Sequence, residues 1–185
     1  MYLYHYYDSS RAPFLNLSDL PQEKAEEILE EIKRINPGSQ AAKRHSEYVA
    51  NRLYYEGIMR EKFAEMGGII KRNAPHYMVV GECEWLSGWF ENSAFIKIPL
   101  SEFDLRTVSF TYGDSHPTFS PRVNDGLEYR KRLYNYEGIM DLIERYGMPQ
   151  EKQNGNVFYI EVQIWSDETI DRYRVLPSAD KFNSR

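Results

Sequence analysis

The residues best suited to chemistry lie between Leu105 and Gly126, in the segment LRTVSFTYGDSHPTFSPRVNDG. Hydroxyl groups, an acid and an imidazole follow one another there within a few residues. Arginines flank the segment, and a planar guanidinium can bind carboxylate or phosphate oxygens through two parallel hydrogen bonds. We therefore predict a ligand site that includes Ser109, Thr111, Asp114, His116, Arg106 and Arg122.

No motif in this segment specifies a reaction. Asp114 and His116 are metal ligands by type, but no second histidine or carboxylate pair stands at a diagnostic spacing, so no metal site is predicted. Ser115 lacks the G-x-S-x-G setting of a hydrolase nucleophile. Nearby acids such as Asp104 could also neutralise the arginines in ordinary surface pairs, which leaves the ligand interpretation open.

A carboxylate also stands in the segment VFYIEVQIW, residues 157–165, which has the clearest strand pattern of the chain. Successive side chains of a strand point to opposite faces, so Glu161 shares a face with Tyr159 and Gln163. Two interpretations are open: this face is the solvated outer side of a sheet, or it lines a polar pocket.

The elements that must position these residues predict an α+β fold. Strand patterns cover 2–7, 76–81, 94–99, 106–112 and 157–165, and helical patterns cover 21–35, 40–66 and 136–146. We expect a single domain over 1–165 with a mostly antiparallel sheet, on which an N-terminal helical hairpin and one further helix pack. Residues 166–185 are predicted to be extended or partly disordered.

Charge and hydropathy exclude several classes of protein. The chain has 23 Lys and Arg against 28 Asp and Glu, a formal charge of -5, which argues against broad nucleic-acid binding. No stretch approaches the roughly twenty apolar residues needed to span a bilayer, and the first residues do not resemble a signal peptide. Cys83 is the only cysteine. We therefore expect a cytoplasmic protein that does not bind membranes.

Two resemblances add to these observations. The run PHYMVVGECEWLSGWFENSAFIKIPLSEFDLRTVSFTYGDSHPTFSPRVNDG, with LYHYYD and YIEVQIWSDE, resembles a group of uncharacterised bacterial proteins over nearly the whole chain. The order of His5 in LYHYY, Tyr112 in SFTYG and Glu161 in YIEVQ is similar to that of ADP-ribosyltransferase-like domains. This second resemblance implies that NAD binds, that His5 bonds the nicotinamide ribose and that Tyr112 stacks on the nicotinamide ring. It also implies that Glu161 holds a ribose hydroxyl and favours the oxocarbenium-like state.

The sequence is therefore consistent with two functions: a nucleotide- or NAD-handling transferase, and a non-catalytic protein-interaction module. The module would bind a protein partner or a second copy through a Tyr/Trp-rich surface around Trp85, Trp89 and Phe90. An enzyme should gather His5, Glu161 and residues 109–116 around one concave pocket. An interaction module should instead expose a contiguous aromatic patch.

Overall fold

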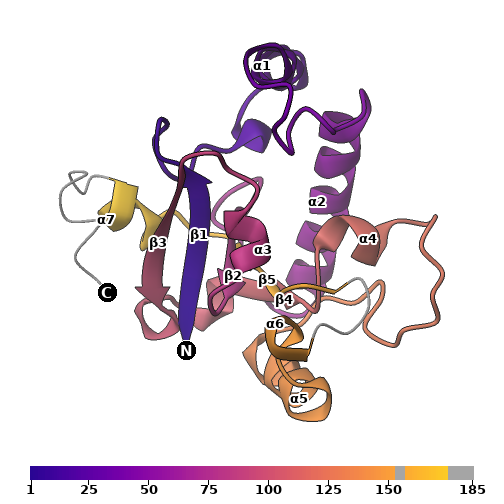
Figure 1. The fold of residues 1–185 in the computed structure, drawn as a ribbon. Coiled ribbons are helices and arrows are strands. Elements are labelled where there is room, and N and C mark those ends of the chain that lie inside the picture. Colours follow the sequence, from indigo (N-terminus) through magenta and orange to yellow (C-terminus); the bar gives the residue numbers. More distant parts are fainter. Residues whose placement is uncertain (153–156, 175–185) are drawn as a thin grey trace.

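The computed structural model describes residues 1–152 and 157–174, and it has the predicted α+β fold, built on a five-stranded antiparallel sheet (Figure 1). The strand order is β3-β1-β2-β5-β4, so both the first and the last strand of the chain lie inside the sheet. The strands are β1 (Tyr2–Asp8), β2 (His76–Val80), β3 (Ser93–Pro99), β4 (Val108–Thr111) and β5 (Glu161–Ile164).

Helices lie on both sides of this sheet. Figure 1 shows α1 end-on and α2 along its length, so the two helices of the predicted hairpin cross steeply. None of the helices within 1–152 and 157–174 combines the length and the apolar character needed to cross a bilayer. The helices are α1 (Gln22–Ile35), α2 (Tyr48–Glu65), α3 (Glu84–Ser87), α4 (Ser115–Phe119), α5 (Tyr136–Tyr146), α6 (Pro149–Lys152) and α7 (Ile170–Arg174).

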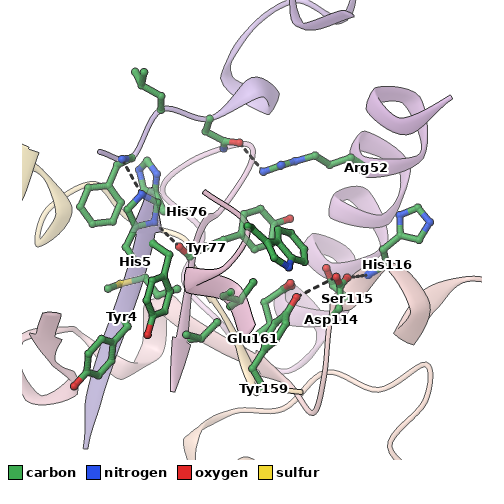
Figure 2. A pocket seen from close by; sticks show the side chains of 18 of the residues that line it. Tyr4, His5, Arg52, His76, Tyr77, Asp114, Ser115, His116, Tyr159 and Glu161 are labelled. Carbon is green, nitrogen blue, oxygen red and sulfur yellow. Dashed lines mark hydrogen bonds between the residues drawn. The ribbon is translucent and has the colours of Figure 1, made fainter. Parts of the chain in front are cut away.

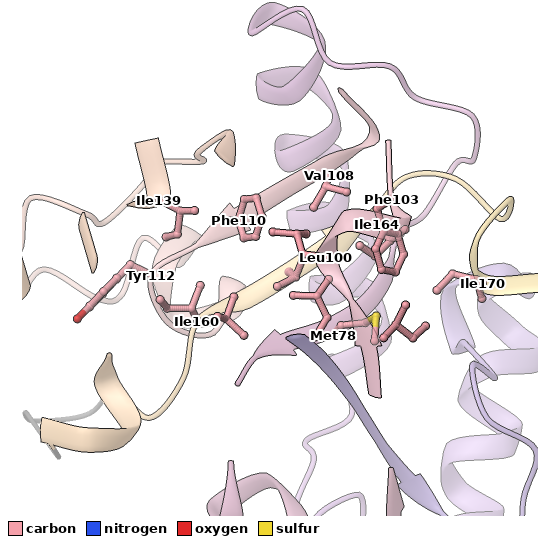
Figure 3. Packing of buried hydrophobic residues seen from close by; sticks show 14 of the residues in the cluster. Met78, Leu100, Phe103, Val108, Phe110, Tyr112, Ile139, Ile160, Ile164 and Ile170 are labelled. Atoms are coloured by element: carbon pink, nitrogen blue, oxygen red, sulfur yellow. The ribbon is translucent and has the colours of Figure 1, made fainter. Parts of the chain in front are cut away.

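One face of the sheet carries the main hydrophobic core (Figure 3). Alternate residues of the paired strands β4 and β5 point into it, as the period of two predicts. The helix α5 covers this face with one apolar stripe. Fully buried members of this core include Val108, Phe110, Ile139, Val162 and Ile164.

The opposite face of β4 and β5 is also covered, so the interpretation of Glu161 as part of a solvated outer face is wrong. Helix α2 packs Phe63 against Trp165, with ring centroids 5.9 Å apart. Under this cover Ser109 and Gln163 have no exposed surface, and Glu161 is only 8% exposed. A period of two reports which residues share a face, but not whether another element covers that face.

Three local features differ from the predicted pattern. The second helix begins at Tyr48 instead of Gln40, because consecutive turns occupy the preceding residues. A short helix, α4, forms between the predicted strand 106–112 and the predicted helix 136–146, where the Asp114 side chain accepts from the backbone N–H of His116. Strand β5 begins at Glu161 and is therefore shorter than predicted. Val80, the last residue of β2, donates its backbone N–H to the carbonyl of Ile160. Phe158, which precedes this bond in the chain, is 38% exposed.

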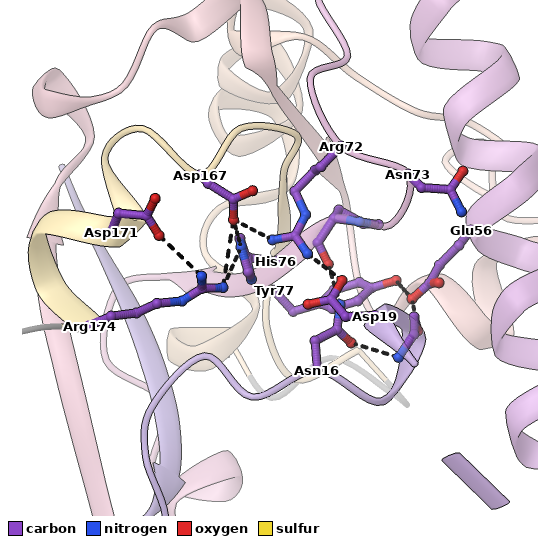
Figure 4. Close-up of polar contacts among 12 residues, drawn as sticks. Asn16, Asp19, Glu56, Arg72, Asn73, His76, Tyr77, Asp167, Asp171 and Arg174 are labelled. Atoms are coloured by element: carbon purple, nitrogen blue, oxygen red, sulfur yellow. Dashed lines mark hydrogen bonds and ion pairs between the residues drawn. The ribbon is translucent and has the colours of Figure 1, made fainter. Parts of the chain in front are cut away.

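The segment after residue 165 continues the domain as far as the structure describes it. Ile170 of α7 is fully buried in the main core. Ion pairs fix the same segment: Asp167 accepts from Arg72 at 2.8 Å and lies 2.6 Å from His76 Nε2, while Arg174 pairs with Asp171 at 3.1 Å (Figure 4). Residues 166–174 are therefore not a loose extension, and the predicted tail over 175–185 lies outside the described residues.

Candidate functional site

A pocket of about 270 Å³ opens on the face of the sheet that α2 covers (Figure 2). Strands β1, β2 and β5 form its floor, and residues of α2, α4 and the segment that follows α3 form its walls. Many of the side chains that line the pocket are aromatic, among them Tyr4, Tyr48, Tyr55, Tyr77, Trp89 and Tyr159.

Two carboxyl groups lie in this pocket. Burial, together with the nearby Asp114 carboxylate, raises the pKa of Glu161 from its ordinary value of 4.5 to about 8, although hydrogen bonds from Ser115 and Gln163 oppose the shift. Asp114 accepts from the His116 N–H at 2.7 Å and from the Tyr159 hydroxyl at 3.0 Å. Glu161 is therefore mostly protonated at neutral pH, while Asp114 sits among donors that suit a carboxylate.

Local backbone chemistry explains why Asp114 enters the pocket. Gly113 has φ +108, a conformation that side-chain-bearing residues rarely adopt, and it turns the chain out of the region of β4. Asp114 then begins α4 as its N-cap. The same turn brings Ser115 and His116 to the pocket wall. Three of the residues in the GDSH sequence thus reach the site together.

Behind Glu161 lies a buried polar network that joins β4 to β5. Gln163 Nε2 donates to Glu161 Oε1 at 3.0 Å and to the Thr111 hydroxyl at 3.1 Å, and its Oε1 accepts from the Ser109 hydroxyl at 2.9 Å. The Trp165 indole N–H completes the network by donating to Ser109 at 2.9 Å. Ser109 and Thr111 therefore support Glu161 through Gln163 and do not line the pocket, where the sequence predicted them to bind a ligand.

His5 reaches the edge of the pocket, but the backbone uses both of its ring nitrogens. Strands β1 and β2 pair only at Leu3↔Val80 and Tyr4↔Val79. Where they separate, His5 Nδ1 donates to the Tyr77 carbonyl at 3.0 Å and Nε2 accepts from the Phe14 N–H at 2.9 Å. Desolvation lowers the pKa of His5 to about 4. In this neutral form His5 has no ring nitrogen left to bond a ribose.

Tyr112, which the resemblance placed against the nicotinamide ring, lies outside the pocket on the core side of the sheet. Its hydroxyl donates to the Gly147 carbonyl at 2.8 Å, and its ring centroid lies 4.9 Å from that of Tyr129. Burial raises the pKa of Tyr112 to about 12. Tyr77 and Tyr159 take its place as rings beside Glu161.

The predicted arginines also lie elsewhere. Arg106 is exposed and pairs with Asp104 at 2.8 Å, as the surface-pair alternative proposed, and Arg122 does not line the pocket. The arginines that line it are Arg44 and Arg52, which the sequence reasoning missed. Tyr48, Arg52 and Glu56 stand four residues apart on α2, and this spacing could have indicated a polar face on that helix.

Arg52 is held in place by its neighbours. Its Nε donates to Glu56 Oε1 at 3.0 Å, and a terminal nitrogen donates to Asn16 Oδ1 at 2.7 Å. Glu56 Oε1 also accepts from the Tyr77 hydroxyl at 2.8 Å. The charge of Arg52 is therefore balanced by a buried glutamate, and the pair orients the Tyr77 ring in the wall.

The aromatic residues of the predicted interaction surface are divided between the pocket and the exterior. Trp89 and Phe90 line the pocket. Trp85 is 41% exposed, and its ring is stacked on Phe158 with centroids 4.4 Å apart. Of these three predicted residues, Trp89 and Phe90 thus face the pocket, whereas Trp85 is partly exposed.

Neither a metal site nor a family relationship explains this pocket. Within residues 1–152 and 157–174, no three His, Cys, Asp or Glu side chains are grouped so that they could hold a metal ion. Comparisons with known proteins gave no match to a family model, a curated protein or a solved structure. The pocket's own residues therefore provide the evidence for its function.

Proposed function

We propose that this protein is an enzyme that binds NAD or a related nucleotide by its planar ring and transfers the attached ribose group. The observation that carries this proposal is that one concave pocket combines aromatic walls with the buried carboxyl of Glu161 and with Asp114 beside it. Perturbed carboxyl groups in an aromatic cavity are typical of catalytic sites.

The size and walls of the pocket favour a ring with one sugar. Its volume of about 270 Å³ is near the lower end of the roughly 300–1,000 Å³ of small-molecule sites. Tyr77 and Tyr159 offer flat apolar surfaces against which a nicotinamide ring could stack. The rest of a dinucleotide would extend through the pocket mouth.

The raised pKa of Glu161 gives a reason for NAD in particular. The oxidised nicotinamide ring carries a positive charge, and a cation beside a carboxyl favours its ionised form. Glu161, protonated in the empty pocket, should therefore release a proton when NAD binds. The resulting carboxylate and Asp114 would then stabilise the positive charge that develops on the ribose.

Water is the simplest acceptor of the ribose group. The bond between ribose C1′ and the nicotinamide nitrogen breaks, and its electron pair stays with nicotinamide. Water adds to C1′ and loses a proton, which the ionised Glu161 can accept. Another nucleophile in place of water would make the reaction a group transfer.

Titration calorimetry near pH 7, in two buffers of different ionisation enthalpy, tests the proposal. Wild-type protein should bind NAD and release up to about one proton, whereas NADH, whose nicotinamide ring is neutral, should release none. Glu161→Gln should abolish both the proton release and the formation of free nicotinamide. Glu61→Gln, an exposed glutamate on α2, is the matched control and should behave as wild type.

NAD binding that releases no proton, or that Glu161→Gln leaves unchanged in both heat and nicotinamide formation, would contradict the role of Glu161. Absence of any NAD binding would overturn the proposal as a whole. The second candidate, a protein-interaction module, would then gain support from the exposed stacked pair of Trp85 and Phe158.

A further inference from the structure

Arg44 differs from the other partly buried arginines of this chain. Arg52, Arg72 and Arg130 each form an ion pair with a carboxylate, and Arg60 donates to the Asn73 carbonyl at 3.1 Å. Arg44 is half-buried and forms no side-chain hydrogen bond or ion pair with any of the residues described. Its guanidinium carbon lies instead 4.3 Å from the ring centroid of Tyr48 and 5.3 Å from that of Trp89. Stacking fixes the group and leaves its in-plane N–H donors unused.

Arg44 stands where the pocket opens outward. It lines the main pocket and also a neighbouring hollow that shares Trp89 and Asp114 with it. Lys43 contributes a second positive charge to that hollow and is exposed. The indole N–H of Trp89, which lines both hollows, is buried and has no acceptor among the described residues. The mouth thus combines an unused N–H donor and two positive charges with the one carboxylate of Asp114, whereas Glu161 lies on the floor.

This division of charge determines where an anionic group of a ligand can lie. Beside Glu161 a phosphate would be repelled, because an ionised Glu161 and Asp114 are both negative, whereas at the mouth Arg44 and Lys43 outweigh the single charge of Asp114. Arg52 offers little to a phosphate, because Glu56 already balances its charge. Arg44 has no such partner, and a planar guanidinium matches two phosphate oxygens.

We propose that Arg44, assisted by Lys43, binds a phosphate group of the ligand at the pocket mouth, so that the site selects nucleotides over nucleosides with the same ring. This inference rests on the proposed function, since the ring must occupy the pocket for the phosphate to reach Arg44. It assigns the anion site to the segment between α1 and α2, and not to Arg106 or Arg122.

The test compares nicotinamide riboside with nicotinamide mononucleotide, which differ by one phosphate. Wild-type protein should bind the mononucleotide roughly 10- to 100-fold more tightly, as expected for charge-assisted hydrogen bonds. Added salt should weaken binding of the mononucleotide and leave the riboside nearly unchanged. Arg44→Ala should remove the preference, measured as the ratio of the two affinities in the same variant, and Arg44→Lys should retain part of it. Arg34→Ala, an exposed arginine on α1, is the matched control.

Equal binding of the two ligands by wild-type protein, or a preference that survives Arg44→Ala, would overturn the inference while leaving the proposed function intact. If neither ligand binds, the proposed function fails, and inorganic pyrophosphate then tests the anion site alone. Stabilisation by pyrophosphate that Arg44→Ala and Arg44→Lys both reduce would support the inference. Its absence would overturn it. Circular dichroism of both variants checks that each is folded.

Discussion

At the scale of single residues, Glu161 and His5 have different roles, although the sequence predicted both as site residues. Glu161 has an unusual pKa because it is buried beside another acid. His5 has an unusual pKa because burial removes its ring from water, where the ring replaces hydrogen bonds that β1 and β2 would otherwise make to each other. A perturbed pKa therefore indicates chemistry only where the group is still free to bond a ligand.

Replacing His5 should lower stability. His5→Ala removes the partners of the Tyr77 carbonyl and the Phe14 N–H, and we expect the free energy of unfolding to fall by about 2–4 kcal/mol. His5→Gln, which can both donate and accept, should lose less and should bind NAD as wild type does. Urea denaturation measures the first effect, and calorimetry measures the second.

His45→Ala is the control, because this histidine is exposed, and it should change the free energy of unfolding by less than about 0.5 kcal/mol. A second signature is the dependence on pH. Since the pKa of His5 lies near 4 in the folded protein and near 6.5 in the unfolded chain, its contribution to stability is present above pH 6.5 and is lost as the pH falls toward 4. A folded His5→Ala protein of normal stability that fails to bind NAD would instead assign His5 to the ligand.

At the scale of elements, the alternation of apolar and polar residues along the strands predicted the sheet and the strand face that carries Glu161. It grouped Glu161 with Tyr159 and Gln163, as the structure has them. It could not predict that α2 covers the other face, because packing between distant segments leaves no local pattern. The sequence did not indicate Arg44 for a similar reason. Arg44 contacts both Tyr48 and Trp89, and these two residues lie far apart from each other in the sequence.

The network between β4 and β5 gives a test at this scale. Gln163→Leu keeps the volume but leaves Ser109 without its acceptor and removes one of the donors to Glu161. We expect the free energy of unfolding to fall by about 2–4 kcal/mol. The pKa of Glu161 should rise further, since a donor to its carboxylate is lost. Gln22→Leu, on the exposed start of α1, should leave stability within about 0.5 kcal/mol in the same urea titration. Equal effects of the two substitutions would show that the network contributes nothing.

At the scale of the whole molecule, one carboxyl links folding to the proposed chemistry. Folding removes Glu161 from water and raises its pKa from 4.5 to about 8. Between these pH values the folded protein holds a proton that the unfolded chain has lost, so raising the pH favours unfolding. The pocket therefore contains a group that weakens the fold at neutral and alkaline pH, as expected where a site is built for function.

Glu161→Gln should consequently make the protein more stable while removing its proposed reaction. The amide can keep a hydrogen bond with Gln163 but never ionises, so the gain should be small at pH 5 and should grow until about pH 9. At that pH, a shift of this size corresponds to the order of 3–5 kcal/mol, or a rise in melting temperature of roughly 10 °C. Differential scanning calorimetry across this pH range measures the gain, with Glu61→Gln as a control whose melting temperature should follow wild type. A constant difference between Glu161→Gln and wild type at every pH would mean that Glu161 ionises normally. The proton release proposed on binding of NAD would then lose its physical basis.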